Sequence, residues 1–460
     1  MTRIALLFTA LLAVNYGSNA QNSVAAQRAA TLGSGVNLSH LDNYWNGTPA
    51  QHYGDHVKFA EVNKRQLMLA DIARNGLKTV RIPICFSAWA SLDAPYRWDF
   101  PQNLAAADSL VSWALQQNLR VIIDFHHPEM SGAFPQALNP NRIKWLWTQI
   151  ATRYRNTDPN RVFLELWNEP HGVKLTDWIA TATGLIQTIR PIAPNHTLIV
   201  GAHDWNGIDA LTQLPLFEDK NIIYTFHSYD PFVFTHQGAS WVTELKDARG
   251  VAFPASSTAP AVPASARGTW VENALKNYPK EGNQETMTRQ LAKAKAWSEA
   301  NNVPIFCGEF GSYSEFADSQ SRCNHVFAMY QALGMMDIPI TFWEWDGGFN
   351  YFQKGSTTLL SNCAKEALGF YVLRKQALGV ENNSDVAVRI WPNPARDSFQ
   401  VEADQQIELV EIVNLSGQSL LRKKPTNNQV SIAELADGFY VVKVFGINSK
   451  LLNYKKLVKW

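Results

Sequence analysis

The sequence lacks an excess of charge of either sign, a cysteine framework and long apolar runs. Lys and Arg number 41 against 40 Asp and Glu, a net charge of +1. This balance provides no positive field for nucleic-acid binding. The four cysteines form no C-x-x-C pair, which argues against a disulfide framework and a zinc or redox motif. No stretch reaches the roughly 20 apolar residues of a membrane span.

Apolar and aromatic residues, by contrast, are abundant. Hydrophobic residues make up 46% of the 460 positions, so the chain can bury a large core and is not disordered. The length favours one large domain with a smaller one beside it. Aromatic residues make up 12% and include 16 Trp, whose flat faces suit ligands with apolar C–H surfaces. An uncharged sugar is such a ligand.

The first 20 residues have the pattern of a secretory signal peptide. Arg3 precedes an apolar run over residues 4–14, and small residues follow at 18–20. We predict that residues 1–20 are removed and that the mature protein is a monomer, secreted or held at the outer cell surface. The alternative is a buried N-terminal helix.

The four cysteines are widely separated. Cys85 and Cys307 lie inside apolar, strand-like runs and fit small core residues. Cys323 and Cys363 could form a bridge after export.

Residues 21–380 alternate short apolar runs with helix-period segments. Runs without a polar face are typical of strands covered on both sides, and eight β-then-α units predict a (β/α)8 TIM barrel. An open doubly wound sheet is the alternative, but no Gly-rich nucleotide turn follows the first run. The predicted strands are 33–38, 79–84, 120–125, 162–167, 196–201, 222–227, 304–309 and 339–345. The predicted helices are 61–76, 103–118, 142–155, 174–190, 286–301, 316–335 and 364–376.

Polar residues gather where these predicted strands end. In a TIM barrel the carboxyl ends of the strands carry the chemistry, and polar residues have no packing reason to lie there. A lone histidine is more often structural, but polar ends on six of eight strands favour a site. The residues concerned are Arg81, which lies within the second strand, and Asp124, His126, His127, Asn168, Glu169, His203, Asp204, His227, Tyr229, Glu309, Glu344 and Asp346.

Two carboxylates stand out among them. Glu169 follows the fourth strand and Glu309 ends the seventh, so both side chains can point into the mouth of the barrel. Glycosidic hydrolysis needs a carboxylic acid for the leaving oxygen and a carboxylate for the sugar, and a separation of about 5 to 5.5 Å gives retention of configuration. We expect Arg81 to keep Glu309 ionised while Glu169 begins protonated.

The large domain resembles glycoside hydrolase family 5 over nearly its whole length. The motifs, in order, are V-R-I-P at Arg81, I-I-D-F-H-H, L-W-N-E-P, H-S-Y, G-E-F-G and T-F-W-E-W. The resemblance implies that Glu169 is the acid/base and Glu309 the nucleophile. It further implies contacts to the sugar or to these carboxylates from Arg81, His126, His127, Asn168, His227, Tyr229 and the stacking Trp343.

No metal or cofactor is expected. His126 and His127 could be metal ligands, but no third residue with metal spacing accompanies them.

Residues 386–460 change to short alternating strands separated by turns, as in a small antiparallel β-sandwich. W-P-N-P-A, N-L-S-G-Q, L-A-D-G-F-Y-V-V-K-V and a Lys-rich end resemble the C-terminal sorting domain of type IX secretion substrates. The resemblance implies the secretion machinery as a partner and passage through the outer membrane. A small carbohydrate-binding sandwich is the alternative.

The segment from 230 to about 285 is long for a loop, and its centre is rich in Pro, Ala and Ser. It fits either an excursion beside the substrate, flanked by Trp241 and Trp270, or a surface insertion without consequence.

The leading hypothesis is a secreted retaining endo-β-1,4-glucanase whose partner is a β-glucan. Within the same scaffold the alternatives are a mannanase, a xyloglucanase or a mixed-linkage glucanase, because loops set the substrate. A catalytically inactive glycan-binding surface protein is the alternative from another class, and the presence of both glutamates argues against it.

Overall fold

The computed structural model describes residues 23–41, 62–126, 139–379, 386, 388–393, 395–413, 419–435, 438–447 and 451–459. The predicted signal peptide lies outside these residues.

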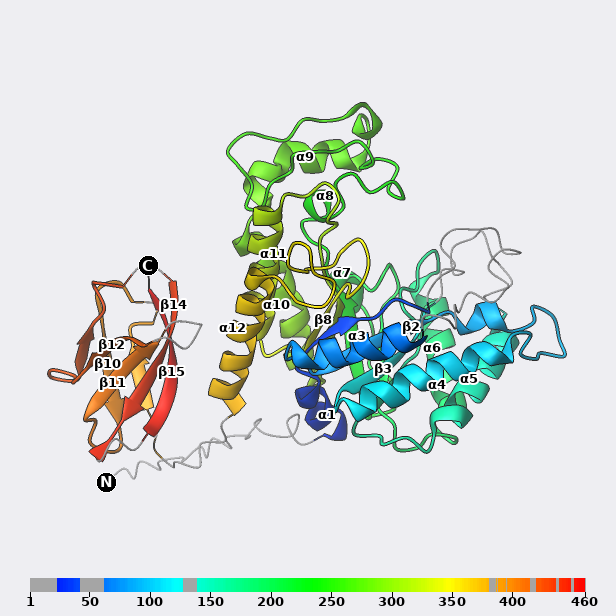
Figure 1. Cartoon of the computed structure of the whole chain (residues 1–460), viewed down its shortest axis with the longest axis horizontal. Helices are drawn as coiled ribbons and strands as arrows, with labels where there is room; N and C mark the ends of the chain where they lie inside the picture. The colour runs from blue at the N-terminus through cyan, green and yellow to red at the C-terminus, as the bar shows by residue number, and fades with distance from the viewer. Residues whose placement is uncertain are drawn as a thin grey trace, which may run out of the picture.

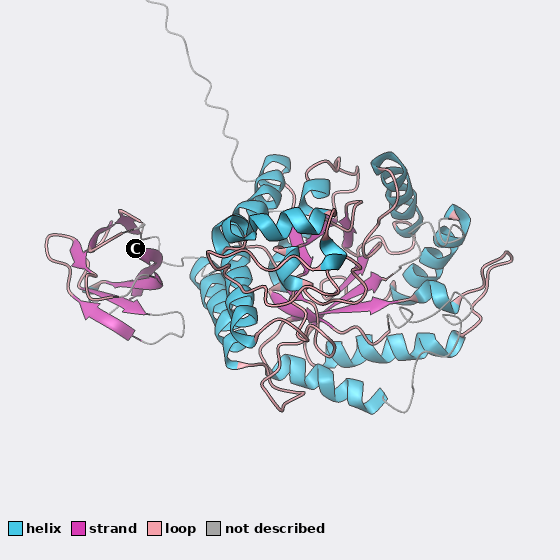
Figure 2. Ribbon diagram, turned by 90° about the horizontal axis from the view of Figure 1, so that it is seen from above, coloured by secondary structure: helices cyan, strands magenta, loops and turns pink. Residues whose placement is uncertain are grey.

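Eight parallel strands close into a barrel. Each strand pairs with the next along the chain, and β1 pairs with β8. Viewed from above, the strands lie inside a ring of helices (Figure 2). The predicted TIM barrel is therefore confirmed. The strands are β1 (Ser34–Asn37), β2 (Thr79–Ile84), β3 (Arg120–Phe125), β4 (Val162–Glu165), β5 (Leu198–Gly201), β6 (Ile222–His227), β7 (Ile305–Glu309) and β8 (Ile340–Phe342).

The helices begin where local sequence satisfies their first N–H groups. Asn139 accepts from the N–H groups of Asn141 and Arg142 just before α5, and Asp318 accepts from Ser321 before α11. The main helices are α3 (Val62–Arg74), α4 (Pro101–Gln116), α5 (Pro140–Tyr154), α6 (Leu175–Ile189), α10 (Gln284–Asn301), α11 (Ser319–Met335) and α12 (Asn362–Gly379). The seven predicted helices correspond to these.

A further helix, α1 (Val24–Leu32), was not predicted and lies across the amino ends of the strands (Figure 1). Its Ala25, Ala29 and Leu32 pack against an apolar layer inside the barrel. The other residues of that layer are Ile122, Phe163, Ile199, Ile223 and Phe306, all fully buried. The lower end of the barrel is thus closed by hydrophobic packing.

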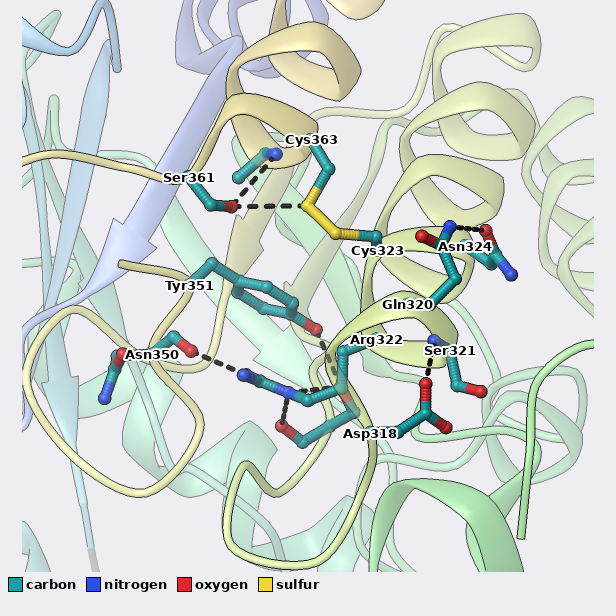
Figure 3. Close-up of a disulfide and its surroundings, with 12 residues drawn as sticks. Asp318, Gln320, Ser321, Arg322, Cys323, Asn324, Asn350, Tyr351, Ser361 and Cys363 are labelled. Carbon is teal, nitrogen blue, oxygen red and sulfur yellow. Dashed lines mark hydrogen bonds between the residues drawn. A yellow bond between two sulfur atoms is a disulfide. The ribbon is translucent and has the colours of Figure 1, made fainter. Parts of the chain in front are cut away.

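Cys323 in α11 and Cys363 in α12 form a disulfide, as the sequence suggested (Figure 3). Beside it, Arg322 donates to the carbonyls of Phe349 and Asn350 and lies over the ring of Tyr351. Cys85 and Cys307 lie outside this disulfide and are buried, in agreement with their prediction as core residues.

The excursion after β6 contains more regular structure than expected. It forms α8 (Phe232–Thr235), the short 3-10 helix η4 (Ala264–Ala266) and α9 (Trp270–Glu281), while most of residues 249–263 remain irregular. α8 and α9 lie on the upper side of the barrel in Figure 1, opposite α1. A four-residue helix, α7 (Ile208–Leu211), follows β5.

The C-terminal segment is an antiparallel β-sandwich with its own core. A three-stranded sheet of order β13-β10-β9 faces a four-stranded sheet of order β12-β11-β14-β15, and both contribute residues to one apolar cluster. The strands are β9 (Val388–Trp391), β10 (Ser398–Ala403), β11 (Leu409–Val413), β12 (Ser419–Lys423), β13 (Gln429–Ser431), β14 (Gly438–Phe445) and β15 (Leu451–Lys459).

Among the described residues, no helix combines the length and the apolar character needed to cross a bilayer.

Candidate active site

The upper half of the barrel interior is polar, and strand alternation explains how. On β3, Ile122 lies in the lower apolar layer and Asp124, two residues later, reaches the upper one. On β4, Phe163 and Glu165 are related in the same way. The same alternation that fills the floor with hydrophobic side chains therefore delivers charged ones to the mouth.

Arg81 is the centre of this polar layer and is completely buried. Its Nε and Nη2 donate to the two oxygens of Glu165 at 2.7 and 2.9 Å. Nη1 donates to Glu309 at 2.8 Å, and Nη2 lies 3.1 Å from Asp124. Burial alone would lower the pKa of Arg81, but the carboxylates of Asp124, Glu165 and Glu309 raise it well above its ordinary value. The guanidinium is therefore a fixed positive charge.

Glu309 has a donor on each carboxylate oxygen. Arg81 donates to Oε1, and the hydroxyl of Tyr229 donates to Oε2 at 2.8 Å. Burial raises the pKa of Glu309, whereas the Arg81 cation opposes that rise. Burial and the neighbouring carboxylates raise the pKa of Tyr229 well above its usual range, so its hydroxyl keeps the proton that it donates. Two donors and a nearby guanidinium favour the ionised form of Glu309.

A β-bulge aims Glu309 at the site. The pairing of β6 with β7 slips by one residue after Phe226, so that His227 pairs with Glu309. A bulge of this kind turns the side chain that follows it. Gly308 must be glycine here, because a Cβ would come within 2.9 Å of His227 Nε2. This contact explains why a glycine precedes Glu309 in the G-E-F-G motif of β7.

Glu169 follows β4 and is more accessible, with 24% of its side chain exposed. Its Oε1 lies 2.6 Å from Nδ1 of His227. Burial raises the pKa of Glu169 to about 7, and the Arg81 cation opposes only part of this rise. Burial also lowers the pKa of His227 to about 4, so this histidine is neutral near pH 7. Glu169 thus holds a proton at higher pH than an ordinary glutamate does.

The two glutamates lie close together. One oxygen of Glu169, one oxygen of Glu309 and a ring nitrogen of His227 are all within 4.8 Å of one another. Three such ligand atoms could also surround a metal ion. Both oxygens of Glu309, however, already accept hydrogen bonds, one of them from the Arg81 cation, and this positive charge disfavours a second cation. The spacing fits a pair of catalytic carboxylates better.

His126 is buried beside this pair and orients its surroundings. Its Nδ1 lies 2.8 Å from Asp124, and burial lowers its pKa to about 4, so the neutral ring donates from Nδ1. Its Nε2 faces the amide of Asn168 at 3.5 Å. The ring also stacks on Trp343, with centroids 5.7 Å apart. Asn168 accepts a hydrogen bond from Arg81 through its own side-chain oxygen.

The structure thus brings eight of the nine residues that the family resemblance implied for the site into one network. His127 lies outside the described residues. Glu165 and Asn37 were missed, although both hold Arg81. A charged residue inside the fully buried run V-F-L-E was the signal for Glu165, because such a charge needs a partner.

The comparisons with known proteins agree with this geometry. The family model for cellulases of glycosyl hydrolase family 5 matches residues 41–348. This chain belongs to that family. A second model, for the secretion system C-terminal sorting domain, matches residues 389–459.

Curated relatives carry endoglucanase names. Endoglucanase 3 of Fibrobacter succinogenes is 32% identical over 308 residues, which cover 62% of this chain and 46% of that protein. Endoglucanase C of Acetivibrio thermocellus is 26% identical over 333 residues, covering 68% of this chain and 90% of that one. The chain therefore spans about half the length of the Fibrobacter relative.

Solved structures give the same result. Endoglucanase Cel5A from Thermotoga maritima has a TM-score of 0.60 at 29% identity, covering 74% of this chain and 98% of that one. A hyperthermophilic endo-β-1,4-glucanase in complex with substrate has a TM-score of 0.61 at 28% identity, with coverages of 75% and 98%.

Proposed function

We propose that this chain is a retaining endo-β-1,4-glucanase that cuts β-glucan by double displacement. The spacing of Glu169 and Glu309 is the observation that carries the proposal. Retaining glycosidases hold their two carboxyl groups about 5 to 5.5 Å apart, whereas inverting ones leave about 6.5 to 9.5 Å for a water molecule. A distance of at most 4.8 Å between oxygens of these two side chains supports retention.

In the first step, Glu309 attacks the anomeric carbon and forms a glycosyl ester. The bond from that carbon to the leaving oxygen breaks, and the proton of Glu169 moves to this oxygen. A carboxyl whose pKa is about 7 is well suited to this step, because a substantial fraction of it is protonated at neutral pH and it is still acidic enough to donate.

In the second step, ionised Glu169 takes a proton from water. The water oxygen attacks the anomeric carbon, the ester bond breaks, and Glu309 leaves as a carboxylate. Arg81 and Tyr229 stabilise this carboxylate in both steps, since each donates to one of its oxygens.

The remaining residues bind the sugar in this proposal. Asn168 faces the substrate 2-hydroxyl, whose hydrogen bond strengthens in the transition state. Trp343 offers a stacking face, and His126 holds both Trp343 and Asn168 in position. His127, by resemblance alone, would be a further sugar contact.

The names of related proteins indicate two candidates for the polymer that is cut. Cellulose-like glucan is the first candidate because the relatives are named endoglucanases. Mannan is the second, because the Thermotoga Cel5A enzyme has been solved with mannotriose as substrate. Reducing-sugar release from carboxymethyl cellulose, glucomannan, xyloglucan and lichenan separates these candidates and the mixed-linkage alternative. Activity on none of them would favour a glycan-binding protein.

The nucleophile assignment is tested by Glu309→Ala. We expect the initial rate on the preferred glucan to fall more than about 10³-fold, because the variant lacks the carboxylate that forms the glycosyl ester. Glu285→Ala is a matched control, since its side chain is 89% exposed on α10. A Glu309→Ala variant that hydrolyses glucan as fast as the parent would exclude the mechanism.

We further propose that residues 1–20 are a signal peptide and that the C-terminal sandwich directs the protein to the outside of the cell. The sorting-domain match over residues 389–459 supports the second part. Expression of the full chain in a bacterium with this secretion system should yield an extracellular enzyme whose N-terminus begins near residue 21. A chain that ends at residue 385 should stay inside the cell envelope.

A further inference from the structure

Three successive residues after β5 have left-handed backbone angles. The φ angles of Asp204, Trp205 and Asn206 are 59°, 54° and 54°. Residues other than glycine adopt left-handed angles only singly, and a bulky residue such as Trp is a clear outlier there. Backbone strain of this kind persists only where the surrounding structure determines it, and it is concentrated at functional sites.

This turn, defined as residues 204–206, holds the backbone on both sides of Glu169. The side-chain amide of Asn206 donates to the carbonyl of Asn168, and the backbone N–H of Trp205 donates to the carbonyl of Pro170 at 3.2 Å. The carbonyl of Glu169 itself is 2.8 Å from Nδ1 of His171. The His171 ring stacks on Trp205 with centroids 4.9 Å apart and planes within 8°.

Asn206 also connects to the histidine that faces Glu169. Its backbone carbonyl accepts from the N–H of His227 at 2.9 Å, and His227 lies 2.6 Å from Glu169. Asn206, a buried residue in the turn after β5, therefore connects the segment after β4 to the end of β6. Gly201 leaves the space for it, because a Cβ there would collide with the Asn206 amide.

We propose that Asn206 is a positioning residue for the acid/base Glu169, acting through the Asn168–Pro170 backbone and through His227. The inference rests on the proposed role of Glu169. Asparagine meets both requirements of the position, because it tolerates left-handed angles and supplies a short side-chain donor. The side chain of Asn168 is held separately by Arg81, so we expect the effect of Asn206 to fall on proton donation to the leaving oxygen and not on sugar binding.

Leaving groups of different basicity separate positioning of the acid from general damage. Dinitrophenolate leaves without a proton, whereas phenolate and a sugar alkoxide need one. The ratio kcat/KM reports the first step, in which the acid acts. The assay therefore compares kcat/KM for 2,4-dinitrophenyl β-cellobioside, phenyl β-cellobioside and soluble glucan.

The test variant is Asn206→Gly, which keeps the left-handed backbone accessible and removes the donor. We expect kcat/KM for phenyl cellobioside and glucan to fall about tenfold or more, a part of the 10²–10⁴-fold that general acid catalysis contributes. The value for dinitrophenyl cellobioside should stay within about twofold of the parent. Asn206→Asp, which has the same shape but presents an oxygen to the Asn168 carbonyl, should give the same pattern and serves if the glycine variant does not fold.

Two controls make the result decisive. Asn118→Gly removes a left-handed asparagine that is exposed and comes just before the amino end of β3, whereas the site lies at the carboxyl ends of the strands, and it should leave all three substrates unaffected. Glu169→Ala should itself show the dependence on the leaving group. If Glu169→Ala reduced all three substrates equally, the proposed function of Glu169 would fail. If Glu169→Ala showed the dependence while folded Asn206 variants lost all three equally, or none, only the role of Asn206 would be rejected.

Discussion

The lower and upper ends of the barrel interior are built on the same strands but obey different constraints. At the lower end, Ile122 and Phe163 pack with α1 into a layer without charge. Two residues further along the same strands, Asp124 and Glu165 surround a buried arginine. The lower layer stabilises the fold through packing alone. The upper layer buries the three carboxyl groups of Asp124, Glu165 and Glu309 at a cost in stability, which is expected where binding and catalysis need fixed charge.

The largest effect should come from removing the cation of the upper layer. Arg81→Met leaves Asp124, Glu165 and Glu309 buried without a positive partner. We expect kcat on glucan to fall at least about 10²–10³-fold. The free energy of unfolding should fall by about 3 to 5 kcal/mol, because a broken buried ion pair leaves uncompensated charge. Initial rates and urea unfolding measure the two effects.

Arg142→Met is the matched control for Arg81. Arg142 is equally buried but donates to the backbone carbonyls of Ser87, Ala90 and Ser91, in the segment that follows β2. Its loss should lower stability and leave kcat of the folded enzyme within about twofold, since uninvolved residues do not alter transition-state binding. Equal losses of kcat in both variants would mean that Arg81→Met acts through the general loss of a buried arginine and not through the charge in the upper layer.

At the lower end, Phe163→Ala should lower the free energy of unfolding by about 3 to 5 kcal/mol, the usual loss for a buried Phe. Phe163 packs among apolar side chains in the lower layer. We therefore expect kcat and its pH dependence to equal those of the parent. Thermal unfolding and a pH-rate profile below the melting temperature measure both. A shifted profile would mean that packing in the lower layer alters the pKa values of the catalytic groups.

The upper layer alone should set the pH dependence. The active form of Glu169 carries a proton, and burial raises its pKa to about 7. The value of kcat/KM should therefore be retained below neutrality and lost as the pH rises through about 7, while ionisation of Glu309 sets the acidic limb. Glu169→Gln should abolish the basic limb. A parent rate that still rises well above neutrality contradicts the assignment.

The smallest effect should come from outside both layers, at the excursion after β6. Trp241 is 57% exposed and packs against Tyr313 and Phe349, and the latter contacts Tyr229. If it stacks on outer sugar units, an aromatic contact of about 0.5 to 1.5 kcal/mol predicts that Trp241→Ala raises KM for long glucan about 2- to 12-fold. Aryl cellobiosides should be unaffected.

Trp391→Ala is the control for this variant, because Trp391 is comparably exposed on the C-terminal sandwich. An unchanged KM in Trp241→Ala would assign Trp241 to packing alone.

Much of this site could be predicted because its residues lie at strand ends, where a polar residue has no packing role. Glu169, Glu309 and Tyr229 were named in this way, and Arg81 from within the second strand. The structure joins Arg81 and Tyr229 to Glu309 by hydrogen bonds, while Glu169 lies beside His227. Glu165 escaped because the fourth run was interpreted as apolar throughout. Its charge could have been noticed as a buried group that requires a partner.

Other features depend on geometry that a single sequence does not encode. The bulge that turns Glu309 inward depends on the register between β6 and β7. The role of Asn206 depends on three positive φ angles in a loop. The helix α1 was missed because its apolar side, with Ala25, Ala29 and Leu32, finds a partner only once the floor of the barrel exists.

Trapping of the glycosyl-enzyme tests the central claim most directly. A 2-deoxy-2-fluoro-β-cellobioside with a dinitrophenyl leaving group slows breakdown of the ester, and peptide mass spectrometry then locates the sugar. The account predicts one fluorocellobiosyl group on Glu309, absent from Glu309→Ala. A label on another residue of an otherwise active enzyme would contradict it.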